Sequence, residues 1–439
     1  MDTLFPFEPA ARVRGEGERG WAKPRVQEAN RAQVELRAVD LEGLLPAEHR
    51  ARTVWAFVER LDLTLFYASV RAVEGHAGRP PVDPKILLAL WLYATLEGVG
   101  SARALARLCE AHEAYRWLAG GVSVNYHTLA DFRVDHVQAL DTLLTQSVAA
   151  LMAAGAVKLR RVAQDGVRVR ASAGASSFRR KARLEACLEA AEAQVKALRA
   201  ELLTDAGASR RRERAARERA MRERQARVAK ALEQLPEVAA KKKAKERAQA
   251  RASTTDAQAR VMKMADGGFR PAYNAQLATD TASQVVVGVA VTNAGSDQGQ
   301  MGVMVEQLCK RYGRRAEAML VDGGFAKLED IERVTQSGSV VYAPVLAPRD
   351  QSRDAHVPRP GDSPEVAAWR QRMGTAEAKT IYKERAATAE CVNAQARNRG
   401  LQQLPVRGVV KATAILLWYA LAHNVMRTAA LVGLGAGIT

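Results

Sequence analysis

The sequence predicts an α/β protein with a mixed sheet at its core, a helical insertion after the first strand and an all-helical N-terminal region. Three observations support this prediction. Residues 41–157 have helical periodicity, residues 159–174 change to a period of two, and residues 178–259 are rich in Ala, Arg, Glu, Lys and Leu. With 439 residues, 48% of them hydrophobic, the chain is long enough for two or three domains.

The chain is strongly basic, with 66 Lys and Arg against 48 Asp and Glu and a formal net charge of +18. Such an excess attracts polyanions, so nucleic acid is the first partner to consider. The four cysteines show no CxxC spacing, which argues against a zinc site or a disulfide framework. The first residues lack the order of a signal peptide, and the apolar runs are short or interrupted. We therefore expect a cytoplasmic protein with no membrane partner.

Residues 1–40 are expected to be an N-terminal extension, and residues 41–157 to form short helices separated by Gly and Pro. Ser101 and Thr128 are candidate N-caps of two of these helices. Short helices with tight turns suit a helix-turn-helix DNA-binding domain, but a helical packing domain fits the pattern equally well.

The first strand is expected in LRRVAQDGVRVRASAG, where Val167 and Val169 alternate with Arg168 and Arg170. Asp165 lies two residues before Val167, so on a strand its side chain points to the same face as the valines. Its carboxylate is therefore expected to face the buried side. That placement is costly unless a cation lies nearby.

Residues 178–259 are expected to form a basic helical hairpin, broken near TDAGAS and again at Pro236. A charge run of this kind is commonly a solvated helix face, whereas an excess of basic residues favours contact with a phosphate backbone. The candidate DNA-binding side chains in this segment are Arg210, Arg211, Arg212 and Arg214.

After the hairpin, FRPAYNAQLATDTASQVVVGVAVTNAG predicts two strands and QGQMGVMVEQLCKRYG a helix. EAMLVDGGFAKLEDIERVTQSG predicts a strand that ends at Asp322, then a turn and a helix, and VVYAPV predicts another strand. Two helices close the chain, in IYKERAATAECVNAQARNRG and KATAILLWYALAHNVMRTAAL, before a tail at 428–439. The catalytic core would thus comprise residues 158–177 and 260–427.

The first of these two helices carries a polar stripe of Tyr382, Glu390, Asn393 and Arg397 where an apolar stripe is usual. No single carboxylate in this region is strong evidence for a catalytic site, and this holds for Asp165, Asp322 and Glu390 alike. On two strands and a late helix of one sheet they form an oxygen donor set for two divalent cations, which activate an attacking oxygen in phosphodiester chemistry. We name these three as catalytic and metal-ligating residues. The residues expected to bind DNA phosphates beside them are Tyr382, Arg385, Asn393 and Arg397.

The motifs VAQDGVRVRASAG, MKMADGGFRPAYNAQLATD and LVDGGF, followed by Tyr382, Arg385, Glu390 and Arg397, resemble the DDE transposases of bacterial insertion sequences. GRPPVDPKILLALWLYATLEGVGSARAL and WLAGGVSVNYHTLADFR resemble that family's helical DNA-binding region. The resemblance implies a ribonuclease H-like core, two Mg²⁺ or Mn²⁺ ions, and double-stranded DNA as partner, both terminal inverted repeats and target. It also implies a homodimer on DNA in the bacterial nucleoid, and it places Asn274 and Gln276 near the site.

Two departures from the family's Tyr-Arg-Glu-Lys signature stand out. Four residues separate Arg385 from Glu390 where the signature has three, and Arg397 replaces the closing Lys. Glu384 is a rival third carboxylate outside the stripe. Two other functions remain open at this point: a metal-dependent nuclease with the same core, and a catalytically inactive DNA-binding relative.

Overall fold

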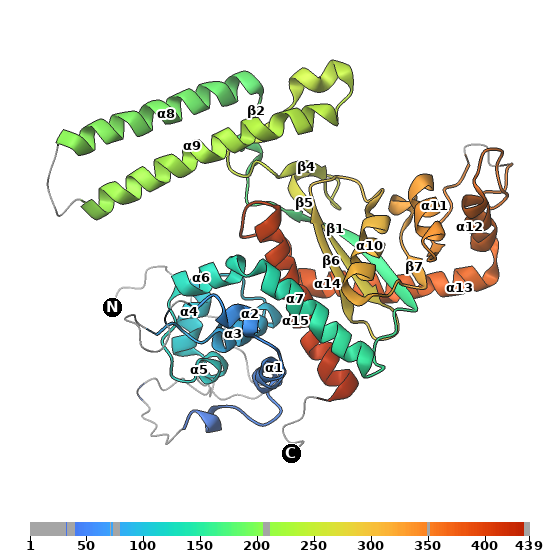
Figure 1. Ribbon diagram of the computed structural model, residues 1–439, viewed down its shortest axis with the longest axis horizontal. Helices are drawn as coiled ribbons and strands as arrows, with labels where there is room; N and C mark the ends of the chain where they lie inside the picture. The colour runs from blue at the N-terminus through green and yellow to red at the C-terminus, as the bar shows by residue number, and fades with distance from the viewer. Residues whose placement is uncertain are drawn as a thin grey trace, which may run out of the picture. The chain divides into compact units, whose positions relative to one another are not determined.

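The computed structural model describes residues 40–70, 80–204, 211–348 and 352–433, together with Ala32 and Ala72 (Figure 1). The chain divides into two compact units, 1–40 and 41–439, and everything below concerns the second. Arg210 lies outside the described residues. The side chains of Arg211, Arg212 and Arg214 lie outside them as well, although their backbone belongs to a helix.

The N-terminal region is helical, as predicted. Its helices are α1 (Arg50–Glu59), α2 (Thr64–Tyr67), α3 (Pro84–Leu96), α4 (Ala102–Ala111), α5 (Glu113–Ala119), α6 (Tyr126–Asp135) and α7 (Val137–Ala153), after a 3₁₀ turn at Glu42–Leu44. Ser101 caps α4 as expected, but Asn125 and not Thr128 caps α6. The Asn125 carboxamide oxygen accepts hydrogen bonds from the backbone N–H groups of both His127 and Thr128, so Thr128 already belongs to the first turn.

The core is a mixed six-stranded sheet, which confirms the α/β class. Its strands are β1 (Arg161–Arg170), β4 (Arg260–Lys263), β5 (Phe269–Asp280), β6 (Val286–Thr292), β7 (Ala318–Leu320) and β8 (Val340–Tyr342). The order is β4-β5-β1-β7-β8, with β6 also paired to β5. β1 is antiparallel to β5 and parallel to β7, and β7 is parallel to β8. The helices between these strands are α10 (Gln300–Tyr312) and α11 (Leu328–Gln336), and α12 (Pro364–Gly374) follows β8. Sequence reasoning did not predict β4.

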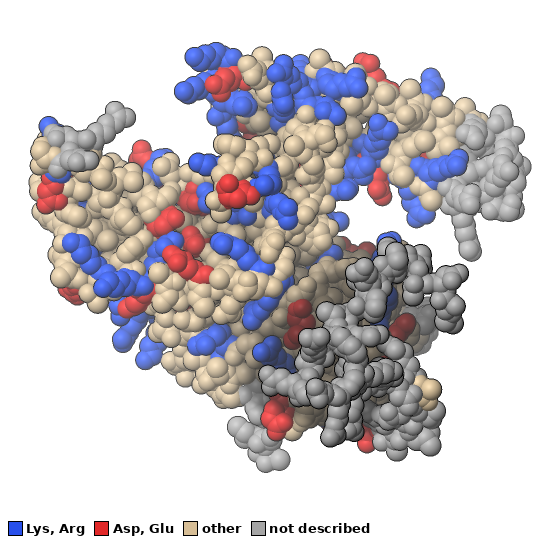
Figure 2. Space-filling view, turned by 180° about the vertical axis from the view of Figure 1, so that it is seen from behind, with Lys and Arg blue, Asp and Glu red and all other residues tan. Residues whose placement is uncertain are grey.

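The basic insertion is a long helical hairpin, here called the arm, made of α8 (Lys181–Thr204) and α9 (Arg211–Ala240). Two short antiparallel strands, β2 (Phe178–Arg179) and β3 (Ala252–Ser253), close its base, and a 3₁₀ segment (Ala244–Gln249) precedes β3. Lys and Arg side chains are gathered along it (Figure 2). The predicted break at Pro236 is wrong: α9 continues through Pro236, because Leu235 and Val238 pack into a small core with Leu184 of α8 and hold that last turn in place.

The C-terminal helices link the two regions. α13 (Ala376–Arg385), a π turn (Ala386–Glu390) and α14 (Cys391–Asn398) run on without interruption, so the predicted single helix is confirmed. α15 (Val409–Val432) packs against β6, α3 and α7, and one continuous hydrophobic core spans the helical region and the sheet. By length and hydropathy α15 alone among the described helices could cross a membrane, but 67% of its apolar stretch is buried within the protein.

A buried histidine on α15 makes folding sensitive to acid. The His423 side chain donates from Nε2 to the carbonyl oxygen of Gln284 at 2.8 Å, and burial lowers the pKa of His423 to about 4. Because the unfolded chain takes up this proton near pH 6.5 and the folded chain does not, the free energy of unfolding falls as pH drops from about 6.5 to about 4. The slope for one such proton is at most about 1.4 kcal/mol per pH unit.

We expect His423→Gln, which keeps a side-chain N–H donor but cannot titrate, to reduce this loss of stability on acidification. Urea unfolding at a series of pH values measures it. His127 is exposed, so His127→Gln is the matched control and should leave the pH dependence unchanged. An unchanged dependence in His423→Gln would contradict the assignment.

Candidate active site

The register of two parallel strands brings the two aspartates to one level. Ala163 of β1 pairs with Leu320 of β7, and Asp165 and Asp322 each lie two residues beyond that pair. Since side chains alternate along a strand, both carboxylates share the face of Ala163 and Leu320. Ala389 packs on this same face, which places the next residue, Glu390, at the rim.

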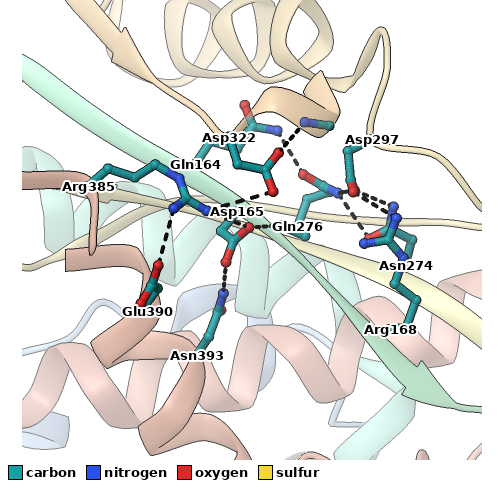
Figure 3. Close-up of polar contacts among 12 residues, drawn as sticks. Gln164, Asp165, Arg168, Asn274, Gln276, Asp297, Asp322, Arg385, Glu390 and Asn393 are labelled. Carbon is teal, nitrogen blue, oxygen red and sulfur yellow. Dashed lines mark hydrogen bonds and ion pairs between the residues drawn. The ribbon is translucent and has the colours of Figure 1, made fainter. Parts of the chain in front are cut away.

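The three carboxylates converge on one guanidinium, that of Arg385 (Figure 3). Its Nη2 lies 3.3 Å from Asp165 Oδ1 and 3.9 Å from Asp322 Oδ2, and its Nη1 lies 3.3 Å from Glu390 Oε1. Arg385 is only 8% exposed. Residues that are far apart in sequence thus meet at one place, and the arginine expected to bind DNA lies at the centre of the carboxylates.

The π turn accounts for the extra residue in the signature. In an α-helix residues i and i+4 lie one above the other, whereas a π turn brings i and i+5 together. The turn covers Ala386–Glu390, and Arg385 and Glu390 form their ion pair across this five-residue spacing. The π turn therefore accommodates the additional residue, and the Glu390 carboxylate remains on the face of the helix that is directed toward the sheet.

The other residues of the stripe have separate surroundings. Asn393 is 2% exposed and donates from Nδ2 to Asp165 Oδ2 at 2.7 Å. Tyr382 is half-buried, and burial raises the pKa of its phenol. Arg397 is exposed, one turn beyond Asn393, and lines a groove next to the carboxylates. Glu384, the rival carboxylate, points elsewhere: it pairs with Arg161 at 2.6 Å and accepts from Thr281 Oγ1 at 2.9 Å.

The negative charge of the clustered carboxylates favours the binding of a cation at this site. Burial raises the pKa of Asp165; the positive charge of Arg385 opposes this shift and the negative charge of Asp322 adds to it. Within the described part of the chain, no three Asp, Glu, His or Cys side chains lie close enough together to hold a metal ion as they stand. The donor chemistry nevertheless fits a hard divalent cation, because the set offers only carboxylate and amide oxygens and already surrounds a positive charge.

A second polar cluster lies on the opposite face of β1, and sequence reasoning missed most of it. Asp297, in the loop after β6, accepts from Asn274 Nδ2 and Gln276 Nε2 through Oδ1, both at 2.7 Å. Its Oδ2 pairs with Arg168 at 2.7 Å, and Gln164 donates to Gln276 Oε1 at 2.9 Å (Figure 3). Asn274 and Gln276, expected near the site, thus lie directly behind it. The sequence did contain one indication of this cluster: residues 164, 166 and 168 alternate with Asp165 along β1 and therefore lie on the opposite face of the strand.

Comparison with known protein families finds two matches in this chain. Residues 39–135, which cover most of the N-terminal helices, match a transposase domain family (DUF772). Residues 351–429, which contain Arg385 and Glu390, match the transposase DDE domain family. No curated protein and no solved structure matches the chain. The two domains define a transposase, an enzyme that moves DNA segments. Both matched ranges are transposase domains, and the second is a DDE domain, of a class that uses divalent metal ions and acts on DNA.

Proposed function

We propose that this transposase acts for an insertion sequence: it binds the element's terminal inverted repeats, cuts at the ends and joins the freed 3′ ends to target DNA. Asp165, Asp322 and Glu390 are the proposed catalytic and metal-ligating residues. The observation that carries this proposal is their convergence on a single buried guanidinium from two adjacent parallel strands and a late helix. Asp165 and Asp322 lie outside both matched family ranges, so the family matches do not connect them with Glu390, and the geometry of the site supports this step.

The sheet order supports a ribonuclease H-like core. Leaving aside the arm and β4, the strands run β1, β5 and β6 in antiparallel pairs, followed by β7 and β8 parallel to β1. Asp165 then lies on the first strand, Asp322 after the fourth, and Glu390 on a helix that follows the sheet. This is the arrangement that the sequence resemblance leads us to expect.

In this mechanism, the residues of the chain position and neutralise charge. Asn393 fixes one oxygen of Asp165, and the N–H of Gly324 donates to Asp322 Oδ1 at 2.8 Å, so both carboxylates keep their remaining oxygens toward the site. Arg385 offsets part of the negative charge of the three carboxylates. Two bound Mg²⁺ or Mn²⁺ ions would supply activation of the attacking oxygen and stabilisation of the leaving oxygen.

A metal-dependent nuclease would use the same carboxylates, and an inactive relative would keep only DNA binding. The experiment that separates these functions incubates the protein with pre-cut element ends, target DNA and Mg²⁺. Joined products support transposition, nicked but unjoined target indicates a nuclease, and bound but unaltered DNA indicates an inactive protein. The DNA flanking the reading frame supplies the inverted repeats to be used as ends.

Arg397 gives a further prediction of this mechanism. We expect Arg397→Ala to lower the cleavage rate more than it lowers DNA affinity. One lost phosphate contact among many changes binding little, whereas a misplaced scissile phosphate reduces the rate directly, by about a hundredfold. Single-turnover cleavage and fluorescence anisotropy measure the two effects. Equal losses in both would make Arg397 part of the general DNA-binding surface.

The arm is proposed to hold DNA or to support dimer assembly, and not to take part in chemistry. It contributes none of the three carboxylates. Its Lys and Arg side chains suit phosphate backbones without reading bases. We further propose that the protein acts as a homodimer on DNA in the bacterial cytoplasm.

A further inference from the structure

An open groove of about 780 Å³ begins beside Asp165, at Gly166 of β1. Its walls are β1, the turn between β4 and β5, the loop at Gly295 and the end of α14. Five basic residues line it: Arg168, Arg170, Lys263, Arg270 and Arg397. Its one acidic lining residue, Asp266, is already neutralised by Arg270, whose Nη1 donates to both carboxylate oxygens at 2.8 and 2.6 Å.

Arg168 is held in a fixed position in this groove. Its Nη2 donates to the carbonyl oxygen of Gly295 at 3.1 Å and pairs with Asp297 Oδ2 at 2.7 Å. Asp297 is 5% exposed and is itself fixed by Asn274 and Gln276. Among the described residues nothing accepts a hydrogen bond from Arg168 Nε or Nη1, and 26% of the side chain is exposed. One edge of the guanidinium is therefore anchored, and the other edge is available to a ligand.

Three more cations in the groove have no ionic partner. Arg170, Lys263 and Arg397 are exposed, and none forms an ion pair within the described part of the chain. Arg397 lies one turn beyond Asn393, which contacts Asp165, so the positive charge begins at the carboxylates and extends away from them. A row of unpaired cations next to an oriented guanidinium suits a ligand with several regularly spaced anions.

We propose that this groove binds the phosphodiester backbone of one DNA strand as it leaves the carboxylate site. Arg168 binds one phosphate at a defined position, and Arg170 and Lys263 neutralise the phosphates that follow. The proposal rests on the proposed function, because continuity with the catalytic carboxylates is what makes the substrate strand the occupant in place of an acidic polypeptide.

The charge part of the proposal is tested with the double variant Arg170→Gln/Lys263→Gln. Fluorescence anisotropy of a fluorescein-labelled duplex of arbitrary sequence is measured over a salt series in EDTA, so that no cleavage occurs. Each lost phosphate contact should reduce the slope of log affinity against log salt by about 0.9, which gives a reduction of about 1.8 for the pair. The matched control, Lys310→Gln/Arg314→Gln, removes the same charge from exposed positions near the end of α10 and should keep the wild-type slope.

The orientation part is tested with Arg168→Lys. Lysine keeps the charge and can still pair with Asp297, but it lacks the second edge of donors. Affinity for DNA should therefore fall about tenfold, as expected for the loss of one charge-assisted hydrogen bond. The thermal midpoint of the variant should stay close to that of the wild-type protein. Unchanged affinity would show that Arg168 serves only to satisfy Asp297 and would overturn this step.

Two results would overturn the groove as a DNA site. One is an equal change of slope in the groove variant and in the control. The other is binding of poly-glutamate that depends on Arg170 and Lys263 as strongly as DNA binding does, which would identify an acidic polypeptide as the ligand. Failure of the proposed function is distinguishable, because it appears as wild-type protein that neither cuts nor joins element ends.

Discussion

The substitution Asp322→Asn is expected to abolish DNA strand cleavage while DNA binding persists. The carboxylate belongs to the set that converges on Arg385, and removing one anionic ligand from a metal site costs about 4 kcal/mol of transition-state stabilisation, or about a thousandfold in rate. The fold should survive, because an asparagine oxygen can still accept the hydrogen bond that Gly324 donates to Asp322 Oδ1. Cleavage of labelled element ends in Mg²⁺ and anisotropy in EDTA measure the two properties separately.

Glu384→Gln is the matched control for this experiment. Glu384 is also a carboxylate next to Arg385 in sequence, but it contacts Arg161 and Thr281 instead of the cluster. Its neutralisation should leave cleavage within a few-fold of wild type, since Glu384 does not contact the carboxylates and a partly exposed ion pair contributes only about 0–1 kcal/mol to stability. Wild-type cleavage in Asp322→Asn would contradict the assignment of Asp322 as a catalytic carboxylate. Loss of cleavage in Glu384→Gln would contradict the assignment of the third carboxylate to Glu390.

The sequence was sufficient for features that follow from periodicity. The alternation around Val167 and Val169 predicts both the strand and the face on which Asp165 lies, and the run AMLVD predicts where Asp322 falls. Their common level could not be predicted, because it depends on the register between β1 and β7, two strands that are far apart in the chain.

Features that depend on local irregularity or on loops could not be predicted. The polar stripe was predicted from a regular α-helix with about 100° per residue, but the π turn shifts the residues after Arg385 relative to those before it. That shift is why Arg385 lies among the carboxylates and not on an outer, DNA-facing surface. Asp297 lies in a loop, for which hydrophobic periodicity carries no information. Its ion pair with Arg168 could therefore not be predicted from the sequence.

Gly166, the residue next to Asp165, is expected to be important for stability. A Cβ atom at position 166 would lie 2.9 Å from Asn274 Oδ1 and even closer to Asp297 Oδ1 and Gln276 Nε2. These atoms are buried and hydrogen-bonded to one another, so none can move away without leaving a polar group unsatisfied. We expect Gly166→Ala to lower the free energy of unfolding by about 3 kcal/mol, the upper end of the usual cost of overpacking a core. Thermal and urea midpoints measure this loss.

Gly295→Ala distinguishes crowding at position 166 from a general cost of replacing glycine. A Cβ atom there would meet only Met262 Cγ, at 3.9 Å, which is ordinary van der Waals contact, so stability should remain close to that of wild type. If Gly166→Ala were as stable as Gly295→Ala, the cluster around Asp297 would have to be loose enough to accept a methyl group. It could then not hold Arg168 in a fixed orientation. A stability measurement at Gly166 therefore tests, without any DNA present, whether the polar cluster behind β1 is rigid enough to position the groove's central arginine.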